Sequence, residues 1–204
     1  MLLTNLISRV QLQSSSIPSN AALIHLQETA RRFFRETSVW VADLTISSVA
    51  EQVAYALDLS GEVDAGTTPK VSRIQNVLFN GSTIHPQGYY LRTSDEYLVF
   101  NTGSVIGETL TDGLVVKVSV IPAIDGTDFP QEHVEKYIDG LVGGALHRLL
   151  KTPNRPYTNP GAAREYQMDY HRDLGRARMD VESEGTERAG GYKKSTDNTG
   201  GISG

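Results

Sequence analysis

Histidine and carboxylate side chains are the residues of this sequence that could do acid–base or metal chemistry. The histidines stand at positions 25, 85, 133, 147 and 171, and none has a metal-binding spacing such as H-E-x-x-H. His133 beside Glu132, and His171 flanked by Asp169 and Asp173, are the best candidates. On a helix, His171 would face about 200° away from each aspartate, because residues two apart do not share a face. We therefore interpret the histidines as solvated or interface residues, and we predict no catalytic residue, no metal site and no cofactor.

Other motifs of enzyme sites do not occur. The segment NTGSVIGETLTDG lacks the G-x-x-x-x-G-K-[ST] phosphate loop, and GLVGGALHR is expected inside a helix and not at a strand-to-helix turn. There is no G-x-S-x-G nucleophile elbow. Asn80-Gly81-Ser82 matches a glycosylation sequon, but Asn-Gly also favours a tight hairpin turn, which is the interpretation we prefer. A pair of carboxylates brought together by folding stays open, although nothing in the sequence argues for one.

Composition narrows the class of protein. The chain has 204 residues and no cysteine, which rules out disulfides, thiolate nucleophiles and cysteine-ligated zinc. Its net charge of −5 disfavours a general nucleic-acid binder, though not a protein past which DNA slides. No stretch approaches about 18 consecutive apolar residues, and the first residues lack the basic n-region of a signal peptide. We predict one domain or two small ones and no membrane partner.

The hydrophobic periodicity predicts an α+β fold. Its expected elements are three main helices in an antiparallel bundle, a small antiparallel β-sheet inserted between the first and second helix, and an extended C-terminal tail. The bundle would comprise residues 20–38 and 129–183, and the sheet residues 39–123. Residues 1–19 form an N-terminal arm, either extended or a short separate helix. Residues 184–204 form the tail, and the third helix should end by Gly185.

Three glycines in the second helix suggest close packing. Gly140, Gly143 and Gly144 each cost about 1 kcal/mol relative to alanine in a helix, which is tolerable where another backbone approaches. That neighbour is either another helix of this chain or a second subunit. Tyr166 and Tyr170, at helical spacing in the third helix, are the expected packing partners.

A proline-rich corner separates the last two helices. It contains Pro153, Pro156, Tyr157, Asn159 and Pro160. Proline forbids continuation of the second helix. Asn159 followed by Pro160 is a helix-start signal, with a side-chain oxygen at the N-cap and a fixed φ at the first helical position.

These segments resemble the adaptor (head-to-tail connector) proteins of tailed bacteriophages. The resemblance rests on Tyr137, Gly144-Ala145 and Arg148-Leu149 in the second helix, and on the Pro156-Tyr157-Thr158-Asn159-Pro160 corner before a long helix with spaced aromatics. ETARRFFRETSVWVADLTI is similar to the family's opening helix and first strand, and FNGSTIHP to its hairpin. The resemblance covers most of positions 20–182.

The resemblance implies a structural role. Family members form a ring below the portal protein, commonly of twelve copies, with tail or nozzle proteins on the distal side and DNA passing through the lumen. This implies a virion protein of the phage neck that is assembled in the host cytoplasm. The family's C-terminal segment holds the portal, so the resemblance gives the tail a docking role.

The tail itself has the composition of a segment that folds on a partner. Residues 183–204 hold six glycines, and burial of so few apolar residues cannot offset about 1–2 kcal/mol of backbone entropy per residue. Tyr192 and Ile202 would be its apolar anchors, and Arg188, Lys193 and Lys194 would contact an acidic groove.

Four alternatives stay open at this point. Two are other components of the phage neck, a stopper or a tail terminator, which would also form a ring. A small hydrolase using a histidine–carboxylate pair would need its histidines to converge in one pocket. A host-side helical scaffold with a regulatory tail is the fourth.

Overall fold

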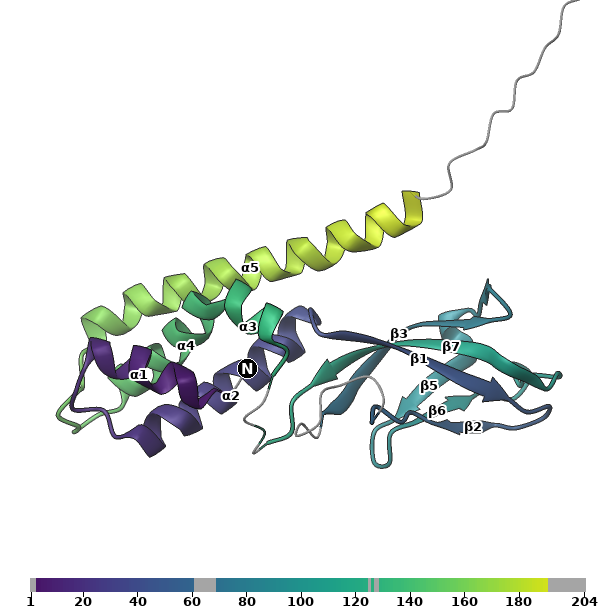
Figure 1. Cartoon of the computed structure of the whole chain (residues 1–204), viewed down its shortest axis with the longest axis horizontal. Coiled ribbons are helices and arrows are strands. Elements are labelled where there is room, and N and C mark those ends of the chain that lie inside the picture. Colours follow the sequence, from purple (N-terminus) through teal and green to yellow (C-terminus); the bar gives the residue numbers. More distant parts are fainter. Residues whose placement is uncertain (1–2, 61–68, 125, 127–128, 191–204) are drawn as a thin grey trace, which may run out of the picture.

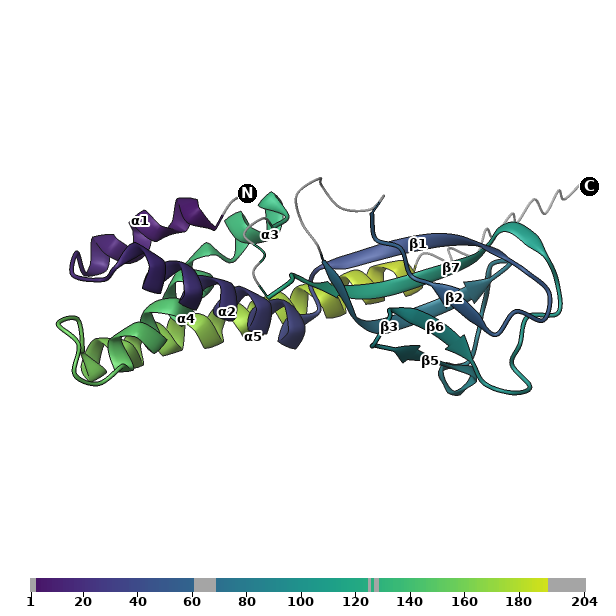
Figure 2. The same ribbon diagram turned by 90° about the horizontal axis from the view of Figure 1, so that it is seen from below.

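The computed structural model describes residues 3–60, 69–124, 126 and 129–190, with side chains up to Ser183. Helices gather at one end of an elongated molecule and strands at the other (Figures 1 and 2). Two connections join the halves: the chain enters the strands directly after the second helix and returns to the helices after the last strand. Among the described helices, none is both long and apolar enough to cross a membrane.

Five α-helices form the helical half in the described residues. Their bounds are α1 Thr4–Gln13, α2 Ser19–Thr37, α3 Gln131–Lys136, α4 Ile138–Lys151 and α5 Pro160–Gly190. α4 lies at the centre and contacts α1, α2 and α5. Each long helix buries an apolar stripe at i, i+3 and i+4 spacing, which is the pattern that hides one face of a helix. In α2 the stripe includes Leu26, Ala30, Phe33 and Phe34, all fully buried.

The prediction of three main helices is wrong in two places. The predicted N-terminal arm contains α1, whose Leu6 and Val10 are fully buried, so the short-helix alternative describes it. The predicted helix beginning near Phe129 is two helices, α3 and α4, separated at Tyr137 with φ −119°. Tyr137 is fully buried, and its ring centroid lies 5.2 Å from that of Phe33. Such a packing contact cannot be read from helical periodicity.

The prediction of one small sheet is also wrong. The described residues form seven strands in two antiparallel sheets. Their bounds are β1 Val41–Ser48, β2 Ala54–Ala56, β3 Lys70–Phe79, β4 Ser82–Thr83, β5 Tyr89–Arg92, β6 Tyr97–Phe100 and β7 Leu110–Ile121. The strand orders are β1-β7-β3-β4 and β2-β6-β5. Runs of β-branched and aromatic residues indicate strands, but they do not say which strand pairs with which.

β7 is an inner strand of the larger sheet. It pairs with β1 through Leu44↔Val116 and with β3 through Val77↔Val116, so both edges of this part of the strand are hydrogen-bonded to neighbours. The predicted alternation in β7 holds for Val116, Val118 and Val120, which are fully buried, but Ser119 on the other face is buried too. Ser119 accepts a hydrogen bond from Gln75 at 2.8 Å.

The predicted Asn80-Gly81 turn is confirmed. Phe79 pairs with Ser82, so β3 and β4 are joined by a two-residue loop. Asn80 has φ +47° and Gly81 has φ +77°, the left-handed conformation that this turn requires and that Asn and Gly tolerate best.

α5 is longer than predicted and replaces part of the predicted extended tail. Its backbone stays helical to Gly190, so the first seven residues of the predicted tail 184–204 are helical. One glycine costs a helix only about 1 kcal/mol relative to alanine, and no proline follows Pro160 in the sequence. Gly185 therefore did not end the helix. The remaining residues of the predicted tail, 191–204, lie outside the described residues.

Candidate functional site

The contact between α4 and α5 is built on the three predicted glycines. A Cβ atom on Gly140 would lie 2.6 Å from Cβ of Asp173, and one on Gly144 would lie 2.6 Å from the ring of Tyr170. A Cβ on Gly143 would lie 3.0 Å from the backbone oxygen of Tyr166. These distances leave no room for alanine without movement. The structure thus brings the predicted glycines and tyrosines together within one chain.

A carboxylate of α5 accepts a hydrogen bond from the first turn of α4. Gly140 is in the first turn of α4, where backbone N–H groups have no partner within the helix, and no side chain at the N-cap supplies one. Its N–H donates to Oδ2 of Asp173 at 2.7 Å. Asp173 is buried, and Arg172 Nε lies 3.7 Å from its Oδ1. Glycine at position 140 therefore lets α5 approach α4 closely, and its N–H binds Asp173 of α5.

The corner between α4 and α5 is held by a threonine that the sequence reasoning passed over. Thr158 Oγ1 donates to the backbone oxygen of Thr152 at 2.6 Å and accepts from the N–H of Arg155 at 3.0 Å. Asn159 acts as predicted, because its Oδ1 accepts from the N–H of Ala162 at 3.1 Å and so caps α5.

The other corner residues have smaller roles. Pro153, Pro156 and Pro160 are exposed, and Tyr157 is half-buried against the core. Asn154, with φ +57°, takes the left-handed conformation that turns the chain. Asn and Gly adopt this conformation at the least cost, which is the signal that could have identified Asn154 in the sequence.

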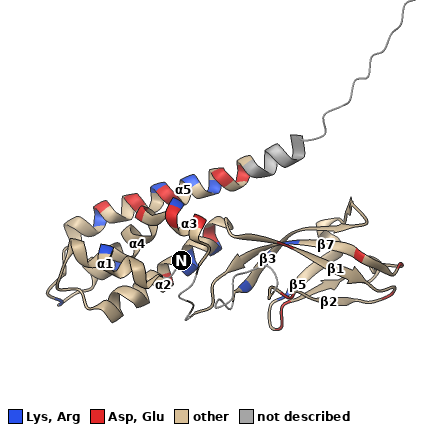
Figure 3. Ribbon diagram, viewed as in Figure 1, with Lys and Arg blue, Asp and Glu red and all other residues tan. Residues whose placement is uncertain are grey.

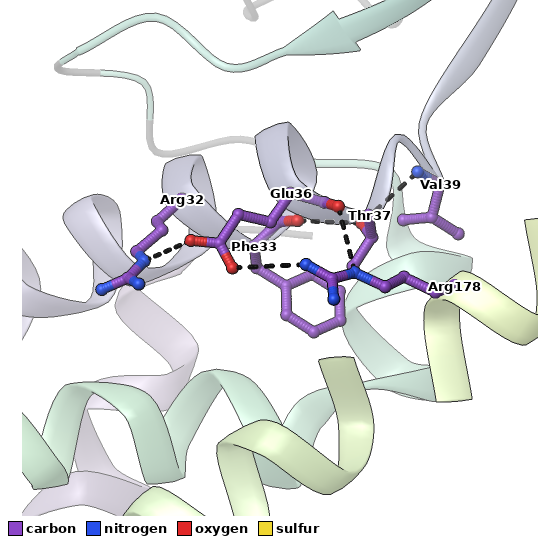
Figure 4. A network of polar contacts seen from close by, with 6 residues as sticks. All are labelled: Arg32, Phe33, Glu36, Thr37, Val39 and Arg178. Atoms are coloured by element: carbon purple, nitrogen blue, oxygen red, sulfur yellow. Dashed lines mark hydrogen bonds and ion pairs between the residues drawn. The ribbon is translucent and has the colours of Figure 1, made fainter. Parts of the chain in front are cut away.

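A second set of polar contacts fixes α5 against the C-terminal end of α2 (Figure 4). The Glu36 carboxylate lies between Arg32 Nε at 2.5 Å and an Nη atom of Arg178 at 3.7 Å. Arg178 Nε also donates to the backbone oxygen of Glu36 at 3.3 Å. The last turn of a helix favours positive charge because its carbonyl groups are unpaired there. Thr37 Oγ1 donates to the oxygen of Phe33 and so binds another carbonyl of this turn.

Past Arg178, the side chains of α5 are no longer buried. The buried positions of the helix are Ala163, Tyr170, Asp173, Leu174 and Ala177, whereas none from Arg178 to Ser183 is buried. Asp180 still contacts α3, accepting from the Tyr137 hydroxyl at 2.7 Å and pairing with Lys136 at 2.9 Å. Figure 1 shows the helix continuing past the bundle toward the strand end of the molecule and diverging from the strands along the way.

The outward face of α5 carries two exposed methionines. Met168 and Met179 are 66% and 64% exposed. Eleven residues complete about three helical turns, so the two side chains lie on one face, with Gly175 between them. A Cβ on Gly175 would meet nothing within 4 Å. Acidic and basic residues alternate along the rest of the helix (Figure 3). We call Met168, Gly175 and Met179 the methionine stripe.

The predicted tail residues receive no structural placement. Arg188 lies within α5, where only the backbone is described. Tyr192, Lys193, Lys194 and Ile202 lie outside the described residues.

The histidines are dispersed, apart from one pair. His85 caps a turn in the strand half by accepting from the N–H of Gln87. His133, in α3, packs on Phe34 of α2. His25 lies 3.6 Å from Glu28, and burial is the main reason that its pKa is lowered. His147 and His171 both line one cavity between α2, α4 and α5. Within the described part of the chain, no three His, Asp or Glu side chains are grouped to hold a metal ion.

This cavity is the main polar feature that the sequence did not reveal. It measures about 90 Å³ and is lined by Thr29, Arg32, Gly144, His147, Arg148, Gln167, Tyr170 and His171. No aspartate or glutamate is among these described lining residues. The His147 ring binds the backbone oxygen of Ala163 through Nδ1 at 2.9 Å, so Nδ1 carries a proton and donates. Because the lining comes from three helices, no local motif could have identified it.

No protein-family model matches this chain, and no curated protein sequence matches it.

Proposed function

We propose that the chain is an adaptor subunit of a phage neck, forming an oligomeric ring that joins the portal protein to the tail and lets DNA pass. The observation that carries this proposal is the projection of α5. From Arg178 to Ser183 the helix has no buried side chain, it keeps a contact with α3 through Asp180, and its backbone remains helical to Gly190. The sequence motifs that resemble phage adaptors supply the choice of family.

The projecting part of α5 is suited to binding another protein. Isolated helices shorter than about 12–15 residues are marginal in water, and most helices in proteins are stabilised by packing. The segment from Arg178 to Gly190 spans about 20 Å at 1.5 Å per residue. A partner surface that covers this segment would bury side chains that are not buried from Arg178 to Ser183.

The base of α5 is rigid enough to aim this projection. The Gly140–Asp173 hydrogen bond, the Thr158 corner and the Glu36–Arg178 contacts fix the helix at three points along its length. A fixed direction matters in a ring, because every copy must present its helix end to the portal at the same angle. Many copies then multiply a weak single contact through effective concentration.

The methionine stripe supports contacts between copies. Exposed methionines are common at binding surfaces because the flexible thioether side chain adapts to different shapes. Gly175 leaves a gap between the two methionines into which a neighbouring side chain can insert. The stripe lies on the face of α5 opposite the bundle, so it is available to a second copy.

The charge of the chain fits passage of DNA. With a net charge of −5, a ring of many copies is strongly acidic and repels the phosphate backbone at long range. DNA would then pass through the lumen without binding.

Electron microscopy of the full chain mixed with the portal protein of the same phage tests the proposal. We expect rings attached to one end of the portal. The double variant Met168→Glu with Met179→Glu should remain folded but lose rings, because two buried carboxylates would lie at each subunit contact. Arg164→Glu with Arg176→Glu, which changes exposed charged positions of the same helix, is the matched control. A chain that stays monomeric in the presence of portal contradicts the proposal.

A further inference from the structure

A groove between α1 and α4 opens on the surface of the helical half, where the two helices contact each other (Figures 1 and 2). It measures about 360 Å³ and is lined by Arg9, Leu12, Gln13, Asp139 and Val142. Leu12 is 82% exposed, because it stands outside the buried stripe of α1 that contains Leu6 and Val10. Val142 is half-buried beside it. The apolar part of the groove is therefore open to a partner.

One base and one acid line the same groove. Arg9 on α1 and Asp139 on α4 are both exposed. Among the described residues, neither of them has an ion-pair partner. The groove thus combines two apolar side chains with two charges of opposite sign that are available to another protein.

The methionine stripe of α5 carries a complementary set of side chains. Met168 is apolar and exposed. Glu165 and Arg172, three residues before it and four after it, are its neighbours on the helix surface. Glu165 is exposed and forms no ion pair within the described part of the chain. Arg172 contacts Asp169 and Asp173 of its own helix, which leaves part of its five-donor fork free.

The groove and the stripe lie at the same level of the helical half. Gln13, which lines the groove, accepts a hydrogen bond from the Tyr166 hydroxyl at 2.8 Å. Met168 follows Tyr166 by two residues, which is about 3 Å along the axis of α5 and about 200° around it. A contact between two different surfaces gives a ring if the rotation closes and a helical filament if it does not. Two surfaces at one level favour a ring whose axis follows α5.

We propose that the groove of one copy receives the methionine stripe of a second copy, so that the copies bind head to tail. Met168 enters the groove and packs on Leu12 and Val142 of the other copy. This inference rests on the proposed ring and names the two surfaces that form it.

The size of the groove fits this occupant. One water needs about 10–15 Å³ of such volume, so a groove of about 360 Å³ has room for a whole methionine side chain. The flexible thioether can adapt to the shape of the groove.

The charges beside the two surfaces fit the same arrangement. Glu165 of one copy faces Arg9 of the other, and Arg172 faces Asp139. Charges at the edge of an interface set orientation and suppress wrong partners more than they add affinity. Arg164 lies on the other flank of the stripe, so its charge is not part of this contact.

Disulfide trapping tests the contact directly, because the chain has no cysteine of its own. Leu12→Cys and Met168→Cys are made as two separate full-length variants. Each is mixed with the portal protein and oxidised glutathione, alone and together with the other. We expect a disulfide-linked dimer of this chain only when both variants are present, because a disulfide joins Cα atoms about 4.4–6.8 Å apart. Lys151→Cys, an exposed position outside the groove, replaces Leu12→Cys in the matched control.

Charge reversal tests the polar part of the contact. Added to the trapping pair, Arg9→Glu should lower the yield of the disulfide about fivefold or more, because it places two acids opposite each other. Arg9→Glu combined with Glu165→Arg should restore the yield. Ser8→Glu, which adds an acid at an exposed position next to the groove, is the matched control and should leave the yield unchanged.

The outcomes separate this inference from the proposed function, with electron microscopy of the same mixtures reporting on rings. Rings together with the mixed-variant dimer support both. Disulfides between two Met168→Cys copies mean that stripe packs on stripe, and disulfides between two Leu12→Cys copies mean that groove packs on groove; either result overturns the inference. Rings with no disulfide in any mixture leave the groove to the portal or to a tail protein, which overturns the inference but not the ring. A chain that forms neither rings nor disulfides contradicts both proposals.

Discussion

The backbone N–H of Gly140 donates to Oδ2 of Asp173 at 2.7 Å, and there is no space between the two residues for a Cβ atom on Gly140. One residue pair thus sets both the separation of α4 from α5 and the capping of the first turn of α4. The proposed function depends on the direction of α5, so a change at this contact tests that dependence.

Gly140→Ala should destabilise the protein by about 1–3 kcal/mol, because the new methyl group overlaps Asp173 and overpacking costs that much in a closed contact. Gly175→Ala is the matched control. It lies in open space on α5, where alanine is about 0.5–1 kcal/mol better than glycine in a helix. Urea unfolding followed by circular dichroism measures both. Equal effects of the two changes would contradict the close packing at Gly140.

Tyr137→Phe should make the free energy of unfolding depend less on pH in the acid range. The Tyr137 hydrogen bond is the main cause that lowers the pKa of Asp180, with Lys136 adding to it. A carboxyl with a lowered folded-state pKa stabilises the protein above its unfolded pKa of about 3.9. That stability is lost as the pH falls through the folded pKa.

The wild type should therefore lose more stability than Tyr137→Phe between pH 6 and pH 3, and the variant should be about 1 kcal/mol less stable at pH 7. Urea midpoints at both pH values measure the difference. Tyr166→Phe is the control, because it removes a hydrogen bond to the uncharged Gln13 side chain, which has no pH dependence in this range. If the wild type and Tyr137→Phe lost equal stability between pH 6 and pH 3, the Tyr137 hydrogen bond would not be what lowers the pKa of Asp180.

The sequence predicted those elements whose signals are local. The Asn80-Gly81 hairpin was readable because both residues favour a left-handed backbone, and the Asn159 cap because the capping residue is adjacent to its helix. The glycines at 140, 143 and 144 indicated a close approach because each is costly in a helix unless something lies against it.

Features that depend on distant residues could not be predicted. At the break, Tyr137 packs on Phe33, which is 104 residues away in the chain. β7 pairs with β1 from the other end of the strand region and with β3 from its middle. The cavity was missed for the same reason, since Thr29, Arg148 and Tyr170 come from three helices. The composition of the C-terminal segment suggested disorder, whereas helical propensity carried α5 to Gly190.

Thr158→Ala should destabilise the protein more than Pro156→Ala. The threonine hydroxyl joins Thr152 and Arg155 across the corner, and its loss removes two hydrogen bonds that contribute about 0.5–1.5 kcal/mol each. Pro156 is exposed, so its replacement acts mainly through the unfolded chain, by about 0.4–1 kcal/mol. Thermal unfolding compares the two. A larger loss of stability for Pro156→Ala would mean that the rigid proline residue, and not the threonine hydroxyl, holds the corner.

Two truncations should separate the roles of the helix end and the segment after it. Deleting residues 184–204 removes the end of α5 and everything beyond, and deleting residues 191–204 keeps the whole helix. Both should fold with unfolding temperatures close to that of the full chain, because no side chain from Arg178 to Ser183 is buried against the bundle.

Portal binding, measured by co-sedimentation, should be lost in the shorter protein. If the protein ending at Gly190 still binds, the projecting helix is the docking element. If it does not, residues such as Tyr192 and Ile202 carry the contact, and replacing both with alanine in the full chain should reproduce the loss. Lys151→Ala, an exposed change at the opposite end of the bundle, is the control for nonspecific loss of charge. Full binding by the protein ending at Ser183 would remove the C-terminal segment from the mechanism, because α5 would then be long only for reasons internal to the chain.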